Sequence, residues 1–480
     1  MKTRNSLKTN LIYTVIYQIS ALILPLITAP YISRIIGAKG LGTYSYYHSI
    51  ALYFVYFAML GISNYANRLI SKNSKDKASL NKNFSSVYFL QLITSLFVFL
   101  AYIIFIILFA KNDLLVASIM IFHIISAIFD VSWLFFGLQE FKITSIRQLI
   151  IRIVSFISIF IFVKNENDLW IYTLIMSFSY FAAAFSLWIM MFKKVKIQKC
   201  SFKEIFKHLK PCLILFIPII ASSIYRVMDK IMIGQFNDMT NVGYYESAEK
   251  LIFISSGILG AICSVVMPKI SNLIGNKKID AAKNIFNLTT IFCMFLTFAI
   301  AFGIAGVSKE FIPMFFGDDF INSINISILL CISLPFMIWS MLIRNLYLIP
   351  YELDKIYVKS VIIGAVVNFI TNLILIPIIG VYGAAIGTII ADICLAFFQT
   401  YPIRKNLDIK LFSKYIAIYI LYGIVMIIGI EIIKHCISSR LLCIITEITV
   451  GGMIYIILNI ITMKKNQNFS IEKIRKILKN

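Results

Sequence analysis

The sequence predicts an all-α polytopic membrane protein with about 14 transmembrane helices. The 480 residues are 60% hydrophobic and only 14% charged, with a mean hydropathy of +0.88, and a soluble chain of this composition could not cover its surface with polar groups. Apolar runs of about 20 residues, each long enough to cross a bilayer as a helix, recur along the whole chain. We expect spans at 12–33, 43–65, 84–110, 114–138, 146–163, 169–192, 212–234, 249–268, 285–307, 322–348, 358–378, 382–402, 413–433 and 441–462.

The basic residues support one orientation of these spans. The chain has 45 Lys and Arg against 22 Asp and Glu, a net charge of +23. In so apolar a chain this excess indicates cytoplasmic loops rather than a nucleic-acid partner. With both termini in the cytoplasm, 34 of the 45 basic residues fall in the cytoplasmic segments 1–10, 66–83, 139–147, 193–210, 269–284, 344–359, 404–414 and 464–480.

The cysteines and histidines predict neither a disulfide framework nor a metal site. The eight Cys lie mostly inside apolar runs without a CxxC spacing, and the four His are scattered. Cysteines in such runs behave as small apolar side chains of membrane helices. We therefore expect no cofactor.

Two sequence motifs predict an internal repeat. PYISRIIGAKGLGTYSYYHS (30–49) follows the first span, and MDKIMIGQFNDMTNVGYYES (228–247) closes the seventh. A weaker pair joins 133–148 to 339–360, again six spans apart. Because six is even, the copies have the same orientation, which predicts two parallel six-helix lobes related by a pseudo-two-fold axis along the membrane normal. The predicted parts are an N-lobe (1–192), a basic cytoplasmic linker (193–211), a C-lobe (212–403), a two-helix extension (404–463) and a basic cytoplasmic tail (464–480).

Parallel repeats of this kind are typical of transporters that rock one lobe against the other. The first and seventh spans also carry a proline each, Pro25 and Pro218, which permits a kink in the helix. Prolines of membrane helices often serve only packing, and that alternative stays open for both.

Basic side chains at membrane depth are candidates for an anion site. Arg226 and Lys230 are four residues apart and share one helix face. Arg34 lies at the corresponding position of the first span, and Arg344 lies near the inner end of the tenth. A cluster of this kind suits phosphate oxygens. Alternatively, Arg226 pairs with Asp229 while Arg34 and Lys230 extend to the headgroups.

Four carboxylates at membrane depth are candidates for binding a coupling proton or sodium ion: Asp130, Asp229, Asp392 and Glu447. A carboxylate shielded from water can change its charge during a transport cycle. Neighbouring Ser, Asn or backbone groups could equally satisfy each one.

The tyrosines of the two motifs, at 44, 46, 47, 244 and 245, are expected to form an interfacial belt with their hydroxyls among the headgroups. Stacking on sugars at a cavity mouth is the alternative.

LPLITAPYISRIIGAKGLGTYSYYHSIALYF and MDKIMIGQFNDMTNVGYYESAEKLI, with IPIIGVYGAAIGT further on, resemble Wzx-type polysaccharide flippases of the multidrug/oligosaccharidyl-lipid/polysaccharide exporter superfamily. The resemblance implies a multi-pass protein of the bacterial plasma membrane that moves an undecaprenyl-pyrophosphate-linked oligosaccharide by alternating access. It implies that Arg34 and Arg226, with Lys230 and Arg344 behind them, bind the pyrophosphate. The partners implied are this lipid-linked oligosaccharide, membrane lipids, a polysaccharide polymerase and a chain-length regulator, with the protein itself a monomer.

Other functions, both transport and enzymatic, remain open at this stage. A cation-coupled exporter of drugs or metabolites, or a peptidoglycan-precursor flippase, would have the same fold. An integral-membrane polymerase or glycosyltransferase would need an extracytoplasmic site, and the short outer connections disfavour such an enzyme.

Overall fold

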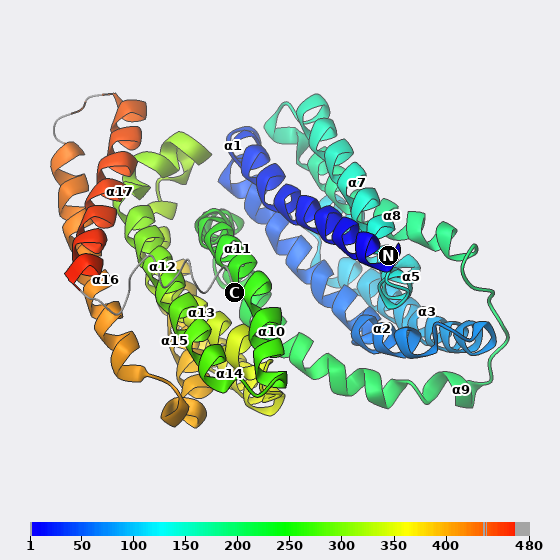
Figure 1. Ribbon diagram of the computed structural model, residues 1–480. Coiled ribbons are helices and arrows are strands. Elements are labelled where there is room, and N and C mark those ends of the chain that lie inside the picture. Colours follow the sequence, from blue (N-terminus) through cyan, green and yellow to red (C-terminus); the bar gives the residue numbers. More distant parts are fainter. Residues whose placement is uncertain (1, 435–436, 438, 466–480) are drawn as a thin grey trace. The chain divides into compact units, whose positions relative to one another are not determined.

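The computed structural model describes residues 2–434, 437 and 439–465, and the predicted basic tail lies outside them from residue 466 on. All regular elements within these residues are helical, which confirms the all-α prediction (Figure 1). The helices are α1 Lys2–Met59, α2 Ile62–Asn73, α3 Lys77–Phe109, α4 Leu114–Ile119, α5 Ile121–Phe129, α6 Ser132–Gly137, α7 Phe141–Phe162, η1 Glu166–Asp168, α8 Leu169–Met191, α9 Phe202–Phe206, α10 Leu209–Phe236, α11 Met239–Gly275, α12 Ile279–Phe316, η2 Asp318–Phe320, α13 Ser323–Ile343, η3 Arg344–Leu348, α14 Asp354–Ile379, α15 Val381–Thr400, η4 Tyr401–Asn406, α16 Ile409–Lys434 and α17 Arg440–Lys465.

Thirteen segments of the described chain are long and apolar enough to cross a membrane. The first, Ile23–Asn73, contains the second predicted crossing, 43–65, and the last part of the first, 12–33, because α1 continues past the predicted loop. Its two halves meet at Gly37, which has φ 66° and ψ 179°, a conformation that a residue with a Cβ rarely adopts. Figure 1 shows the dark blue and lighter blue halves of α1 running away from this corner. The break at Gly37 therefore reconciles thirteen segments with the expected fourteen crossings.

The predicted fourth span, 114–138, consists of three short helices, α4, α5 and α6. A break at membrane depth leaves backbone carbonyls that need partners inside the protein. Gln91 of α3 supplies them, because its Nε2 donates to the carbonyl oxygens of Ala127 at 2.7 Å and Asp130 at 3.0 Å. Its Oε1 accepts a hydrogen bond from Trp133 Nε1 at 2.9 Å. One buried amide therefore holds the break between α5 and α6.

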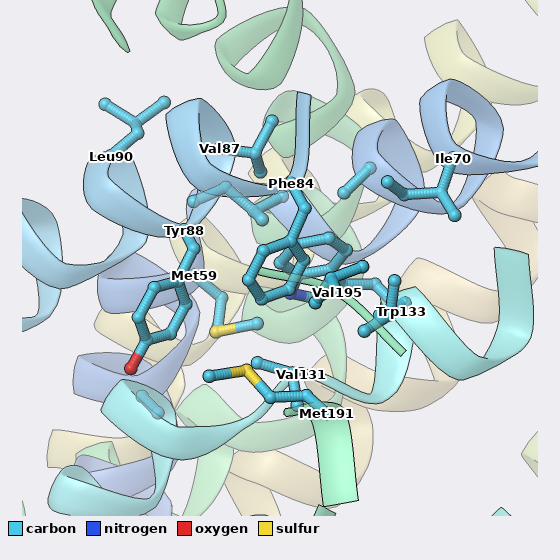
Figure 2. Close-up of a cluster of buried hydrophobic side chains, with 14 of the residues drawn as sticks. Met59, Ile70, Phe84, Val87, Tyr88, Leu90, Val131, Trp133, Met191 and Val195 are labelled. Atoms are coloured by element: carbon cyan, nitrogen blue, oxygen red, sulfur yellow. The ribbon is translucent and has the colours of Figure 1, made fainter. Parts of the chain in front are cut away.

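A cluster of buried side chains surrounds this break. Figure 2 shows Phe84, Tyr88, Trp133, Met59 and Met191 converging from α1, α3, α6 and α8. The rings of Phe84 and Trp133 lie 5.3 Å apart, and both side chains are fully buried. The cluster joins helices that are distant in sequence into one core.

The chain divides into two compact units, Met1–Gly243 and Tyr244–Asn480. The boundary falls in α11, so α10 belongs to the first unit, where it packs against α1 and α2. The sequence placed the corresponding span, 212–234, in the C-lobe on the basis of its motif. Because the predicted lobes rest on a repeat and not on contacts, they stay a prediction.

In the second unit, α14 and α15 form an antiparallel hairpin that turns at Gly380, with φ 64°. A Cβ at Gly383 would lie 2.6 Å from the carbonyl oxygen of Leu375. Only a glycine allows the two backbones to approach so closely.

The last two helices, α16 and α17, pack against each other and against α12. The Tyr455 hydroxyl donates to the carbonyl oxygen of Phe295 at 3.1 Å, and Lys434 Nζ lies 3.5 Å from Glu310 Oε2. Polar links of this kind join helices where surrounding lipid offers no competing partner.

Replacing the buried amide of Gln91 should destabilise the first unit. Gln91→Leu leaves two carbonyl oxygens and the Trp133 indole without their partners, at a cost of roughly 1–3 kcal/mol for each unsatisfied group. We expect a lower thermal unfolding midpoint for the detergent-solubilised protein. The exposed Asn64→Leu variant is the control, and an equal midpoint in both variants would contradict this role of Gln91.

Candidate functional site

The two repeated motifs contact each other directly, backbone to backbone. A Cβ at Gly42 would overlap the carbonyl oxygen of Met239, and a Cβ at Gly243 would overlap the carbonyl oxygen of Ala38. The contact therefore joins residues 38–42, at the start of the second half of α1, to residues 239–243. Each motif contributes one glycine because no side chain fits between the two backbones.

The helix α10 also fits closely around a tyrosine of the first motif. Gly234 lies against the ring of Tyr46, whose hydroxyl donates to Gln235 Oε1 at 3.4 Å. At its other end, α10 meets Gly61, where a Cβ would lie 2.8 Å from the carbonyl oxygen of Cys212. Glycines thus allow close contact at both ends of this helix.

The prediction of an interfacial tyrosine belt is wrong for four of its five tyrosines, and the fifth, Tyr244, is half-buried. Tyr44, Tyr46, Tyr47 and Tyr245 are between 1% and 9% exposed, so their rings pack inside the protein. The Tyr245 hydroxyl, for example, forms a 3.0 Å hydrogen bond with Thr388 Oγ1. The glycine contacts explain the error, because they bring helices close enough to cover neighbouring aromatic rings.

Three predicted cations lie in the first unit. Arg34 and Arg226 are exposed, and Lys230 is half-buried. Arg226 lies within electrostatic range of the Tyr56 hydroxyl on α1. The first unit therefore presents basic side chains on α1 and α10, the two helices that carry the motifs.

Tyr53 and Tyr56 are neighbours of these charges that sequence reasoning missed. The Tyr53 hydroxyl lies near Ser223 and the buried Asp229 of α10. The rings of Tyr53 and Tyr56 are perpendicular at 6.4 Å. Their spacing of three residues, about two helical turns after the tyrosines of the motif, was the available sequence signal.

The fourth predicted cation, Arg344, belongs to the second unit. It begins the π-helix Arg344–Leu348, a distortion often found at functional sites. Its guanidinium lies 4.5 Å from the centre of the Tyr357 ring, and its buried Nε has no hydrogen-bond partner in the described part of the chain. Arg344 is thus held by an aromatic face with donor capacity to spare.

The four predicted carboxylates have different surroundings. Asp130 caps the start of α6, because its Oδ1 accepts from Ser132 N at 2.9 Å. Glu447 is buried and its Oε1 lies 3.4 Å from Cys443 Sγ. Asp229 is 2% exposed and Asp392 is fully buried. Asp130 therefore has a local structural role, while Asp392 and Glu447 are both fully buried.

Asp392 lies in a polar part of the α14–α15 hairpin. Gly387 contacts Asn372, and one further turn along both helices brings Ala391 beside Asn368. The contact between Gly364 and Leu395 continues the same register. Asn368 and Asn372 are fully buried, and Asn372 Nδ2 donates to Asn368 Oδ1 at 3.3 Å. The register thus sets Asp392 at the level of a buried amide pair.

In the described part of the chain, no cluster of three or more His, Cys, Asp or Glu side chains could hold a metal ion.

The second unit also contains an apolar cavity of about 800 Å³. Side chains of α12, α13, α15 and α16 line it, among them Phe298, Pro335, Trp339, Phe397 and Ile420. Its walls suit a hydrocarbon chain and offer few polar groups.

Comparison with known proteins connects these features to a family. The model of the family described as "Polysaccharide biosynthesis protein" matches residues 7–274. A protein of Escherichia coli (strain K12) named "Putative O-antigen transporter" is 25% identical over 404 residues, covering 81% of this chain and 94% of that protein.

Two solved structures share the fold. One is described as lipid II flippase MurJ in an inward closed conformation, with a TM-score of 0.75, 20% identity, and coverage of 95% of this chain and 99% of that chain. The other is an inward-facing multidrug resistance MATE family transporter, with a TM-score of 0.55, 13% identity, and coverage of 82% and 97%. At these identities the likeness establishes the fold alone.

The contact between the two motifs predicts a strong effect of added methyl groups. Gly42→Ala and Gly243→Ala each force a Cβ into a backbone carbonyl, and overpacking of this kind costs about 1–3 kcal/mol. We expect both variants to unfold at lower temperature than the parent protein in detergent.

Gly275→Ala is the matched control, since nothing lies within 4 Å of the added Cβ. If all three variants unfold together with the parent protein, the backbones do not touch as described.

Proposed function

Because the chain belongs to the polysaccharide biosynthesis protein family, we propose that it moves lipid-linked oligosaccharide repeat units across the bacterial plasma membrane for surface polysaccharide synthesis. The observation that carries the proposal is the family match over residues 7–274, together with a relative named as an O-antigen transporter that is matched over 94% of its length. Thirteen apolar helical segments agree with a multi-pass transporter. By the distribution of basic residues, both termini face the cytoplasm.

The substrate proposed is an oligosaccharide on undecaprenyl pyrophosphate. Arg34, Arg226, Lys230 and Arg344 would bind the pyrophosphate, because guanidinium and ammonium groups match phosphate oxygens. The neighbouring hydroxyls of Tyr53 and Tyr56 would offer hydrogen bonds to sugars. The 800 Å³ apolar cavity of the second unit is of a kind that accommodates an isoprenoid chain.

The transport step proposed is alternating access. The contact between residues 38–42 and 239–243 brings backbone against backbone at Gly42 and Gly243. Such a contact can part and re-form without breaking ion pairs, which suits a closure at one end of the transport path. Opening this closure and closing the opposite end would carry the bound headgroup across the bilayer.

The ion that drives the cycle is proposed to bind at Asp392, with Asp229 and Glu447 as further candidates and Asp130 as the weakest. A buried carboxylate beside amide oxygens can hold either a proton or a sodium ion. The further partners expected from this role are a polysaccharide polymerase and a chain-length regulator, with the flippase itself a monomer. No cofactor is required.

Two alternatives have specific support. The MATE-like fold is compatible with cation-coupled drug or metabolite export, and the MurJ-like fold with a peptidoglycan-precursor flippase. Basic residues on α1 and α10 favour an anionic passenger over cationic drugs. An integral-membrane polymerase or glycosyltransferase is not proposed, because the matched relative carries a transporter name.

Deleting the gene in its host should cause the lipid-linked oligosaccharide to accumulate while surface polysaccharide falls. Both pools are measured in the same cells, and the parent gene should restore them. Arg226→Ala should lower the rescue by at least about tenfold, since a charge-assisted contact contributes about 1.5–3 kcal/mol. Lys405→Ala, at an exposed charge of the second unit, should rescue fully.

If neither pool changes and drug sensitivity rises, the exporter alternative replaces this proposal. If peptidoglycan precursors accumulate instead, the passenger is a different lipid-linked saccharide.

Asp392→Asn should uncouple transport from its driving gradient. The amide keeps the shape of the carboxylate and cannot exchange a charge. In proteoliposomes, we expect the parent protein to respond to an imposed proton or sodium gradient and the variant to lose that response. Glu447→Gln provides the comparison, and a variant at Asp392 with an unchanged gradient response would exclude this carboxylate.

A further inference from the structure

The first unit has a second cavity, of about 320 Å³, between α2 and the start of α10. One wall comes from α2, with Tyr65, Arg68, Leu69 and Lys72, and the other from α10, with Pro211, Ile214 and Leu215. We name it the α2–α10 groove. The α2 wall thus carries the polar and basic groups, and the facing wall is apolar.

The polar wall follows from helical spacing. Tyr65, Arg68 and Lys72 are separated by three and four residues, so they lie on one face of α2. Arg68 and Lys72 are exposed, and within the described residues neither forms an ion pair. Two cations on one face with no internal counterion attract an anion.

The Tyr65 side chain is fixed by a buried hydrogen-bond network. Its hydroxyl lies 2.7 Å from Nδ1 of His208, and Nε2 of this histidine lies 2.9 Å from Ser86 Oγ. With the Ser86 hydroxyl donating to the carbonyl of Asn83, His208 donates from Nε2 and accepts at Nδ1. The Tyr65 proton therefore points at His208, and its oxygen keeps lone pairs for a donor in the groove.

The apolar wall continues along the membrane-facing side of α10. Ile214 is 59% exposed, and Leu213 and Ile217 nearby are 42% and 53% exposed. In the orientation proposed above, segment 66–83 is cytoplasmic, so the basic wall lies at headgroup depth. The exposed apolar residues of α10 then lie at the depth of the acyl chains in the inner leaflet.

The positive-inside tendency explains basic residues in this segment without requiring a site. It does not explain why two of them share a cavity with an apolar wall. Lys75 and Lys77, in the same segment, do not line the groove. The groove therefore combines features that match an amphiphile: donors for a phosphate, an acceptor for a headgroup hydroxyl and a surface for an acyl chain.

We propose that the α2–α10 groove binds an anionic phospholipid of the inner leaflet, with its phosphate between Arg68 and Lys72 and one acyl chain along Ile214 and Leu215. A headgroup hydroxyl donates to Tyr65, which favours phosphatidylglycerol over lipids without such a donor. The inference depends on the proposed orientation and not on the proposed transport.

The test uses the full chain, delipidated in detergent and titrated with phosphatidylglycerol, with the bound lipid counted by native mass spectrometry. Arg68→Ala/Lys72→Ala should bind phosphatidylglycerol at least about tenfold more weakly than the parent protein. Lys75→Ala/Lys77→Ala removes the same charge from the same segment and should bind like the parent. Phosphatidylcholine should bind weakly to all three proteins.

Two further measurements address the acyl wall and the source of the phosphate. Ile214→Ser keeps both cations and should still weaken phosphatidylglycerol binding, whereas glycerol phosphate without acyl chains should not displace the lipid. Equal binding by both double variants would overturn the proposal. So would displacement by glycerol phosphate alone, or displacement by undecaprenyl phosphate at lower concentration than phosphatidylglycerol, which would assign the groove to the transported lipid.

Discussion

Helices in a bilayer gain little by burying apolar side chains against each other, because the surrounding lipid is equally apolar. Close backbone contact and hydrogen bonds between helices must therefore hold this protein together. Gly42 and Gly243 show the first device, and Gln91, joined to two carbonyls and Trp133, shows the second.

Polar side chains at membrane depth fall into two groups by this reasoning. Gln91 and Asp130 complete their hydrogen bonds on the break that they stabilise, so their presence follows from structure. Exposed Arg226 and the half-buried Arg344, whose Nε has no partner among the described residues, are different. Groups with remaining hydrogen-bond capacity are the better candidates for contact with a substrate. Asp392 stands between the groups, because it is fully buried at the level of a buried amide pair.

Two sites with phosphate-binding chemistry follow from the same composition. The basic residues of α1 and α10 are candidates for the headgroup of a transported lipid, while the α2–α10 groove combines two cations with an apolar wall. The helix α10 contributes to both, through Arg226 in one half and Ile214 in the other. A lipid in the groove would therefore contact the helix that carries the second motif, near the end at which Gly61 meets Cys212.

The sequence by itself determined the class of fold and the family resemblance. Apolar runs must become helices in a bilayer, because no other arrangement within one segment satisfies the hydrogen bonds of the backbone. The two motifs with their glycines are local patterns, so they can be recognised from the order of residues alone. Its basic residues were likewise visible as candidates, since a charge in an apolar run is conspicuous.

Only the tertiary structure decided which side chains meet. It buried the motif tyrosines that an interfacial belt would expose, gave Asp130 a helix to cap, and brought Tyr53 and Tyr56 beside α10. It also gathered Tyr65, Arg68 and Lys72 opposite Pro211 and Ile214, which are more than 130 residues away in the chain. Such pairings depend on the distance between helix backbones, and in this protein that distance is set by glycines whose contacts lie far away in sequence.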